Sequence, residues 1–123
     1  MVASTATLAA LRAAIQQRRV VAFQAKGHAR TFSPHVLGTK DGQWRVFGWQ
    51  SGGGSGGSLK AGGDWRCFGV ADVAGIEVLP GLWQSGDPTE GFGLTCIDLI
   101  DTAADLEAAA KALPGRKKRP HER

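Results

Sequence analysis

The chain has 123 residues, of which 42% are apolar and 21% charged, a length and composition typical of one folded domain rather than a disordered chain. Its longest apolar runs span only a few residues, as at positions 20–23, so no segment is long enough to cross a bilayer and we expect no membrane partner. The N-terminus lacks the basic and apolar regions of a secretion signal. These features together predict a cytoplasmic protein.

The net charge of +4 is unevenly distributed along the chain. Residues 1–66 carry nine Lys or Arg and two acids, a charge of +7, whereas residues 67–115 carry one Lys and eight acids, a charge of −7. The remaining +4 lies in residues 116–123, which we expect to be a disordered basic tail. The split favours either a basic face for an anionic partner or ion pairing between the two halves, and the sequence leaves both open.

The side chains that carry most protein chemistry are few and scattered. Cys67 and Cys96 lack metal-type spacing, and with no sign of export we expect two reduced thiols buried as small apolar groups. His28, His35 and His121 are far apart in the chain, so we expect neither a metal site nor a catalytic histidine. The sequence therefore predicts a protein that is not an enzyme and needs no cofactor.

The N-terminal segment has helical periodicity. Leu8, Leu11 and Ile15 lie at positions i, i+3 and i+7, which predicts a helix over residues 7–18 with one apolar stripe. Thr7 is the predicted N-cap.

Short segments rich in β-branched and aromatic residues follow, separated by turn residues. We expect Lys26-Gly27 and Asp41-Gly42 to form turns and Pro34 to end the second strand. Five short strands at this spacing predict a small barrel or a strongly bent sheet. The predicted strands cover residues 20–24, 30–34 with an extension to 38, 44–49, 65–68 and 76–79.

Side-chain alternation assigns the third predicted strand two faces. Trp44, Val46 and Gly48 share one face. The other face holds Arg45, Phe47 and Trp49. The Gly/Ser run at residues 51–58 then predicts a long, mobile hairpin loop.

The C-terminal part predicts one more strand and one more helix. Residues 94–100 read as a sixth strand. Residues 101–113 read as a helix capped by Asp101 or Thr102 and ended by Pro114-Gly115. We therefore predict a single α+β domain over residues 1–115 with an N-terminal helix and a C-terminal helical extension.

Four segments occur in an order that resembles the WYL domain family, a bacterial Sm-like/SH3-like barrel named for a Trp-Tyr-Leu strand. The resemblance covers residues 11–79, a little over half of the chain. It implies an SH3/Sm-like β-barrel of about five antiparallel strands. The segments are the helix and strand within residues 11–23, Arg30-x-x-x-Pro34-x-x-Leu37, Asp41-Gly-Gln-Trp44-Arg-Val46 in the place of the tripeptide, and Arg66-Cys-Phe68-Gly-Val-Ala-Asp72-Val73.

In that family the domain usually follows a winged-helix DNA-binding domain and is thought to sense nucleic acids or nucleotide ligands through the tyrosine and several arginines. The positions that match are Trp44, Arg66 and Phe68, with Arg30 and Pro34 matching more loosely.

Other family positions differ in this chain. Arg45 stands where the family has tyrosine, and Gly69 and Asp72 replace two family arginines. No DNA-binding domain precedes the barrel in this sequence, so we expect a stand-alone, divergent member.

The resemblance and the residues together predict a non-catalytic, regulatory binding module for nucleic acid or a nucleotide-like anion. Arginines on strands can offer planar forks to phosphate, and exposed indoles can stack on bases; solvated or ion-paired arginines and core-packed aromatics are the alternatives. The alternative function is a protein-interaction or homo-oligomerisation domain. The candidate binding residues are Arg30, Arg45, Arg66, Trp44, Trp49 and Trp65.

Overall fold

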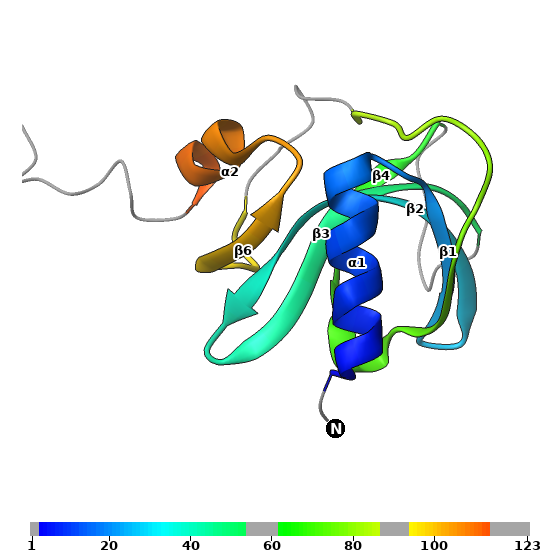
Figure 1. The fold of residues 1–123 in the computed structure, drawn as a ribbon, viewed down its shortest axis with the longest axis horizontal. Helices are drawn as coiled ribbons and strands as arrows, with labels where there is room; N and C mark the ends of the chain where they lie inside the picture. Colours follow the sequence, from blue (N-terminus) through cyan, green and yellow to red (C-terminus); the bar gives the residue numbers. More distant parts are fainter. Residues whose placement is uncertain (1–2, 54–61, 87–93, 114–123) are drawn as a thin grey trace, which may run out of the picture.

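The computed structural model describes residues 3–53, 62–86 and 94–113, which form two helices, a short 3-10 helix and one antiparallel sheet (Figure 1). The α+β class with a helix near each end is as predicted. The elements in chain order are α1 (Thr5–Gln17), β1 (Val21–Ala25), β2 (His28–Lys40), β3 (Gln43–Gly53), β4 (Asp64–Gly69), the 3-10 helix η1 (Val70–Asp72), β5 (Ala74–Val78), β6 (Leu99–Ala103) and α2 (Leu106–Ala112).

Helix α1 begins earlier than its apolar stripe predicts. The side chain of Ser4 accepts a hydrogen bond of 3.0 Å from the backbone N–H of Thr7, so Ser4 and not Thr7 is the N-cap. Arg18 ends the helix in a left-handed conformation. Leu11 and Ile15 are fully buried, which confirms the apolar stripe.

The sheet is bent around α1 but does not close into a barrel. Its strands follow the order β4-β3-β2-β1-β5, and every pairing is antiparallel. Strand β6 also pairs with β2, along a later part of β2 than the part that pairs with β1. Among the described residues the end strands β4 and β5 are not paired with each other. The predicted antiparallel sheet is confirmed and is curved (Figure 1), whereas the predicted barrel closure is absent from the described strands.

Two tight turns follow the predicted chemistry. Lys26 and Gly27 join β1 to β2, and Asp41 and Gly42 join β2 to β3. All four residues have positive φ, at 51°, 81°, 51° and 76° in chain order. Two-residue hairpins with positive φ at both positions are type I′ turns, which follow the right-handed twist of the strands that they connect.

Strand β2 runs through Pro34, so this proline does not end it, and the predicted extension to residue 38 belongs to the same strand. The first part of β2, up to Phe32, pairs with β1, and the part from Val36 onward pairs with β6. Pro34 lies between these pairings, next to a register shift against β3. Because neither β1 nor β6 pairs with β2 at Pro34, the missing N–H breaks no ladder bond on that edge.

The segment after β5 fills this gap along β2. The indole Nε1 of Trp83 donates to the carbonyl oxygen of Pro34 at 2.9 Å. The backbone N–H of Gln84 donates to Ser33 Oγ at 3.0 Å, and its carbonyl oxygen lies 3.0 Å from Nε2 of His35. Residues 83 and 84 therefore satisfy polar groups that no strand reaches.

The two faces of the sheet bury separate apolar cores. Beneath α1, the rings of Phe23, Phe32 and Phe68 meet edge to face at 5.3–5.4 Å. On the opposite face, a second core forms under β6 and α2. It consists of Val36, Phe47, Leu94, Ile97 and Ala109. The predicted alternation of β3 is confirmed, since Val46 belongs to the first core and Phe47 to the second.

The boundaries of the last two elements differ from those predicted. Residues 101–103 belong to β6 rather than to a helix, and α2 is capped by Asp105, whose carboxylate accepts from the N–H of Ala108 at 3.1 Å. Helix propensity and the apolar pattern favoured a longer helix. The backbone pairing of β6 with β2 overrides that preference.

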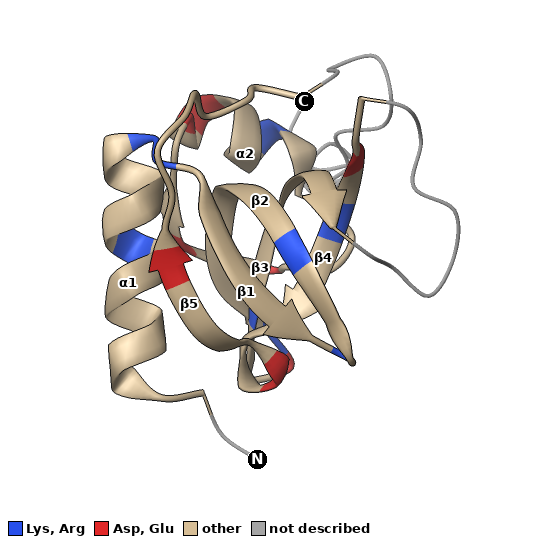
Figure 2. Ribbon diagram, turned by 90° about the vertical axis from the view of Figure 1, so that its right-hand side faces the viewer, with Lys and Arg blue, Asp and Glu red and all other residues tan. Residues whose placement is uncertain are grey.

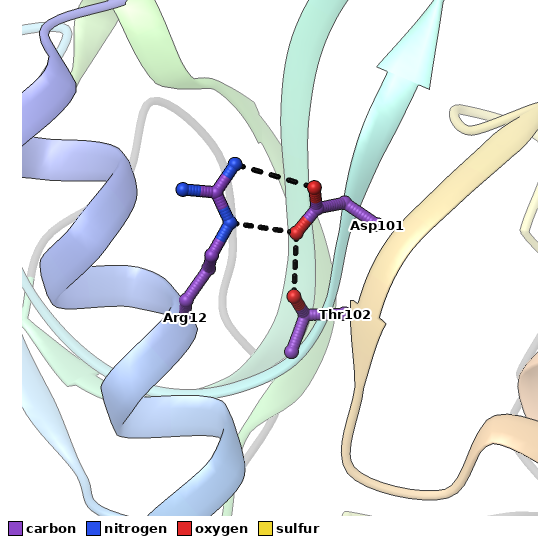
Figure 3. A network of polar contacts seen from close by, with 3 residues as sticks. All are labelled: Arg12, Asp101 and Thr102. Carbon is purple, nitrogen blue, oxygen red and sulfur yellow. Dashed lines mark hydrogen bonds and ion pairs between the residues drawn. The ribbon is translucent and has the colours of Figure 1, made fainter.

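A side-chain network also holds residue 101 in the strand (Figure 3). Arg12 on α1 donates from Nε to Oδ1 of Asp101 at 2.8 Å and from Nη2 to Oδ2 at 3.2 Å, and Thr102 donates to the same carboxylate. The hydrogen bond from Arg12 is the main cause of the lowered pKa of Asp101, with Thr102 adding to it. The network ties the first helix to the last strand.

The two cysteines form a disulfide, so the prediction of reduced thiols is wrong. Cys67 in β4 and Cys96 before β6 lie with their Cα atoms 6.7 Å apart, although 29 positions separate them in sequence. The spacing of the cysteines along the chain does not reveal this disulfide. The disulfide requires the two Cα atoms to lie close in space, and the path of the chain after β5 decides whether they do.

Two other predictions fall outside the described residues. Most of the predicted mobile loop lies within 54–61, and the predicted basic tail within 114–123. Within the described ranges, no helix is long and apolar enough to span a membrane.

Candidate ligand pocket

The structure does not bring the three predicted arginines to one face of the sheet. Residues paired directly across two antiparallel strands point to the same side, and Arg66 pairs with Gly48 whereas Arg45 pairs with Gly69. Positions 45 and 48 lie on opposite faces of β3. Arg66 therefore lies on the α1 side of the sheet and Arg45 on the other.

The side chain of Arg30 is buried and packs inside the protein. Its guanidinium donates to the carbonyl oxygen of Ala25 at 2.9 Å and to Oε1 of Gln50 at 3.3 Å, and it lies 5.0 Å from the ring centroid of Phe68. Burial lowers the pKa of Arg30, and the nearby positive charge of Arg66 lowers it further. Arg66 is also 3.9 Å from the carboxylate of Asp64.

Two of the predicted tryptophans belong to an aromatic layer on the opposite face. Trp65 stacks on Phe47 with centroids 5.1 Å apart, and Trp49 meets Trp65 edge-on at 5.1 Å. Trp49 is only 8% exposed, and its Nε1 donates to the carbonyl oxygen of Gly62 at 3.1 Å. Trp49 therefore packs into the sheet and offers no exposed platform for a base.

Arg45 and Trp44 do lie together, at a cavity of about 640 Å³. The cavity is bounded by the two type I′ turns, β3, β4 and η1. A volume of this size suits a small-molecule ligand. Its polar and aromatic lining comes from Lys26, Gln43, Trp44, Arg45 and Asp72.

The electrostatics of this cavity favour an anion. The Nε of Arg45 is buried, and within the described part of the chain it has no hydrogen-bond partner. Lys26 is 3.7 Å from Asp72, but both side chains are largely exposed, so this ion pair is weak. The guanidinium of Arg12 lies 5.5 Å from the ring centroid of Trp44. The arrangement can donate hydrogen bonds to an oxyanion beside an indole.

Charge pairing between the two halves of the sequence is observed as well. Arg12 with Asp101, and Lys26 with Asp72, join the basic and acidic halves. Figure 2 shows Lys and Arg positions on several elements, among them α1, α2, β2 and β4. Ion pairing between the two halves is therefore observed for these two pairs, whereas a basic face for an anionic partner stays a prediction. In the ranges that the structure covers, no cluster of three or more His, Cys, Asp or Glu could hold a metal.

A family model for the WYL domain matches residues 6–78, from α1 to the end of β5. The match covers more than half of the chain, which therefore belongs to the WYL domain family. Domains of this family are generally regulatory, non-catalytic, ligand-binding domains of bacterial transcription regulators. Neither the curated proteins nor the solved structures contain a match to the chain.

Sequence reasoning missed Gln43 and both other charged members of the pocket, Lys26 and Asp72. Asp72 was noted only as a replaced family arginine, and Lys26 only as a turn residue. The positive φ of Lys26 places it in a two-residue turn, and the chain brings that turn close to η1. A basic residue within a tight turn was the one available signal.

Proposed function

We propose that this WYL domain is a regulatory module that binds nucleic acid or a nucleotide-like anion in the pocket lined by Lys26, Trp44 and Arg45. The observation that carries the proposal is that the buried Nε of Arg45, which has no hydrogen-bond partner in the described part of the chain, belongs to a side chain that lines the same cavity as Lys26 and Trp44. A buried donor left without an acceptor costs about 1–3 kcal/mol. A phosphate oxygen at this position would remove that cost.

The rest of the pocket supports the same ligand chemistry. Lys26 can exchange its exposed partner Asp72 for a phosphate, because the existing ion pair is weak. Trp44 is half-buried at the cavity wall and offers aromatic surface to a base. Arg45 replaces the family's tyrosine and supplies a cation at that position.

The test compares two arginines on opposite faces of neighbouring strands. Fluorescently labelled single-stranded DNA and RNA are titrated with the protein, and anisotropy is followed at two salt concentrations. We expect Arg45→Gln to weaken binding about tenfold, as for the loss of one charge-assisted hydrogen bond. Arg66→Gln is the matched control and should leave the affinity nearly unchanged.

Two outcomes contradict this proposal. If Arg66→Gln weakens binding and Arg45→Gln does not, the anion site lies on the α1 side of the sheet. If the unaltered protein binds neither oligonucleotide at low salt, the pocket does not hold nucleic acid.

A second candidate function is homo-oligomerisation. Leu82, Leu99 and Leu106 are 88%, 69% and 62% exposed, and large exposed apolar side chains are typical of interfaces. Sedimentation velocity over a range of concentrations tests this candidate. An apolar interface should persist at high salt, whereas phosphate binding should weaken.

A further inference from the structure

A second cavity, of about 620 Å³, lies between the sheet and the C-terminal extension and shares no lining residue with the pocket of Arg45. The family match ends at residue 78. Arg18, His35 and Trp65 come from the matched part, whereas Trp83, Ala108 and Lys111 come from the chain beyond it. The C-terminal extension therefore completes a site that the matched domain alone does not have.

One wall of this cavity is aromatic. The rings of His35 and Trp83 lie 4.2 Å apart at an angle of 30°, and His35 meets Trp65 edge-on at 5.0 Å. Hydrogen bonds hold these rings in place, since Trp83 donates to Pro34 and His35 bonds to the carbonyl oxygen of Gln84. The wall is thus built before any ligand arrives, which limits the entropy lost on binding.

The facing wall is made of small side chains. Ala108 and Ala112 lie one helical turn apart on α2, and Ala104 precedes the helix. Alanines leave space where larger residues would fill the cavity. An aromatic wall opposite small apolar side chains suits a flat apolar ring system.

Two cations line the cavity, and one of them has an exposed and therefore weak ion pair, because Lys111 Nζ lies 3.7 Å from the carboxylate of Glu107. Arg18 and Lys111 line it, and Asp105 is the acid among the lining residues. The carboxylate of Asp105 is engaged in capping α2. Arg18 lies 5.5 Å from the ring of Trp83 and donates to the carbonyl oxygen of Ala104 at 2.8 Å. Burial lowers the pKa of His35 to about 4, so the imidazole is neutral at pH 7.

We propose that this second cavity binds a small planar aromatic molecule bearing one carboxylate, with its ring between the aromatic wall and α2 and its anion at Arg18 and Lys111. The site is separate from the pocket proposed for nucleic acid. Its ligand contacts both the matched domain and the C-terminal extension, so binding would stabilise their association.

Isothermal titration calorimetry with naphthalene-2-carboxylate tests the proposal, with naphthalene-2-carboxamide as the neutral analogue. We expect the carboxylate to bind at least tenfold more tightly than the amide. Arg18→Gln and Lys111→Gln should each weaken carboxylate binding about tenfold, and Ala108→Leu should abolish it by filling the cavity.

Two control variants separate this site from others. Arg19→Gln removes the neighbouring exposed charge and should leave the affinity unchanged. Arg45→Gln should also bind naphthalene-2-carboxylate normally, whatever its effect on nucleic acid. Thermal melting by circular dichroism checks that every variant folds.

Three results would overturn the proposal. These are equal binding of the carboxylate and the amide, undiminished binding by a folded Ala108→Leu variant, and an effect of Arg19→Gln as large as that of Arg18→Gln. The third result would mean that the carboxylate is attracted by the positive charge of the surface in general and not by Arg18 in particular.

Discussion

His35 shows how one buried side chain links the fold to pH. It lies at the register shift of β2, is 7% exposed, and contacts the rings of Trp65 and Trp83. Burial is the main reason why its pKa falls from 6.5 to about 4, and the positive charge of Arg18 adds to the shift. The folded protein therefore prefers the neutral imidazole.

We expect the free energy of unfolding to fall as the pH drops from 7 to 5. The unfolded chain protonates His35 near pH 6.5 but the folded protein only near pH 4, so this histidine stabilises the fold fully above pH 6.5 and progressively less toward pH 4. Linkage gives a loss of roughly 2 kcal/mol by pH 5. Urea denaturation at both pH values measures it, with His35→Gln as the variant that does not titrate.

Comparing the unaltered protein with His35→Gln at pH 7 and pH 5 separates the effect of His35 from that of Asp101, whose pKa is also shifted. The pKa of Asp101 is lowered from 3.8, so its stabilising effect is present at pH 5 and is lost only as the pH falls further. Equal losses of stability in the unaltered protein and in His35→Gln would contradict the prediction.

At the level of single residues, the sequence predicted the strand face of a residue better than its burial or its neighbours on other strands. Alternation along β3 placed Val46 and Phe47 on opposite faces correctly, because the pleat of a strand is a local property. It could not show that Trp49 is buried, since that depends on the segment around Gly62. The separation of Arg45 from Arg66 depends on the register of β3 with β4, which no local pattern reports.

At the level of elements, local turn chemistry was informative where local bonds decide the structure. The two type I′ turns follow from residue pairs that tolerate positive φ. The boundary between β6 and α2 was predicted wrongly, because Asp101 is held by β2 and Arg12 rather than by its own neighbours. Pro34 was misread for the same reason, since its tolerance depends on a gap between two partner strands.

The disulfide between Cys67 and Cys96 attaches the C-terminal extension to β4. Closing a loop of this length restricts the unfolded chain, so we expect reduction to lower the free energy of unfolding by about 2–4 kcal/mol. Urea denaturation with and without dithiothreitol measures this loss. A Cys67→Ser/Cys96→Ser double variant serves as the control, because its stability should not respond to the reductant.

A free-thiol assay on the unfolded, unreduced protein accompanies that measurement. Two reactive thiols per chain, or a double variant as stable as the unaltered protein, would contradict the prediction. The first result would restore the original expectation of reduced cysteines.

At the level of the whole molecule, one sheet serves two cores. Strands β2 and β3 contribute to both, because Leu37 and Val46 point toward α1 whereas Val36 and Phe47 point toward the C-terminal extension. The family match reaches only the end of β5, yet the second core needs Leu94, Ile97 and Ala109 from beyond it. We therefore expect the extension to be part of the domain's folding unit.

This arrangement predicts that the matched part and the extension unfold together. Leu37 and Ile97 are both fully buried, one in each core, so Leu37→Ala and Ile97→Ala should each cost about 2–5 kcal/mol. Leu82→Ala is the exposed control and should change stability by less than about 0.5 kcal/mol. Urea unfolding followed by tryptophan fluorescence and by far-ultraviolet circular dichroism should give one coincident transition for each protein. The reason is that both cores pack on β2 and β3. Loss of one core would expose one face of these strands to solvent and so destabilise the strands on which the other core packs. A separate early transition in Ile97→Ala, with the remaining structure still folded, would show instead that the extension is an independent unit attached to a self-sufficient WYL domain.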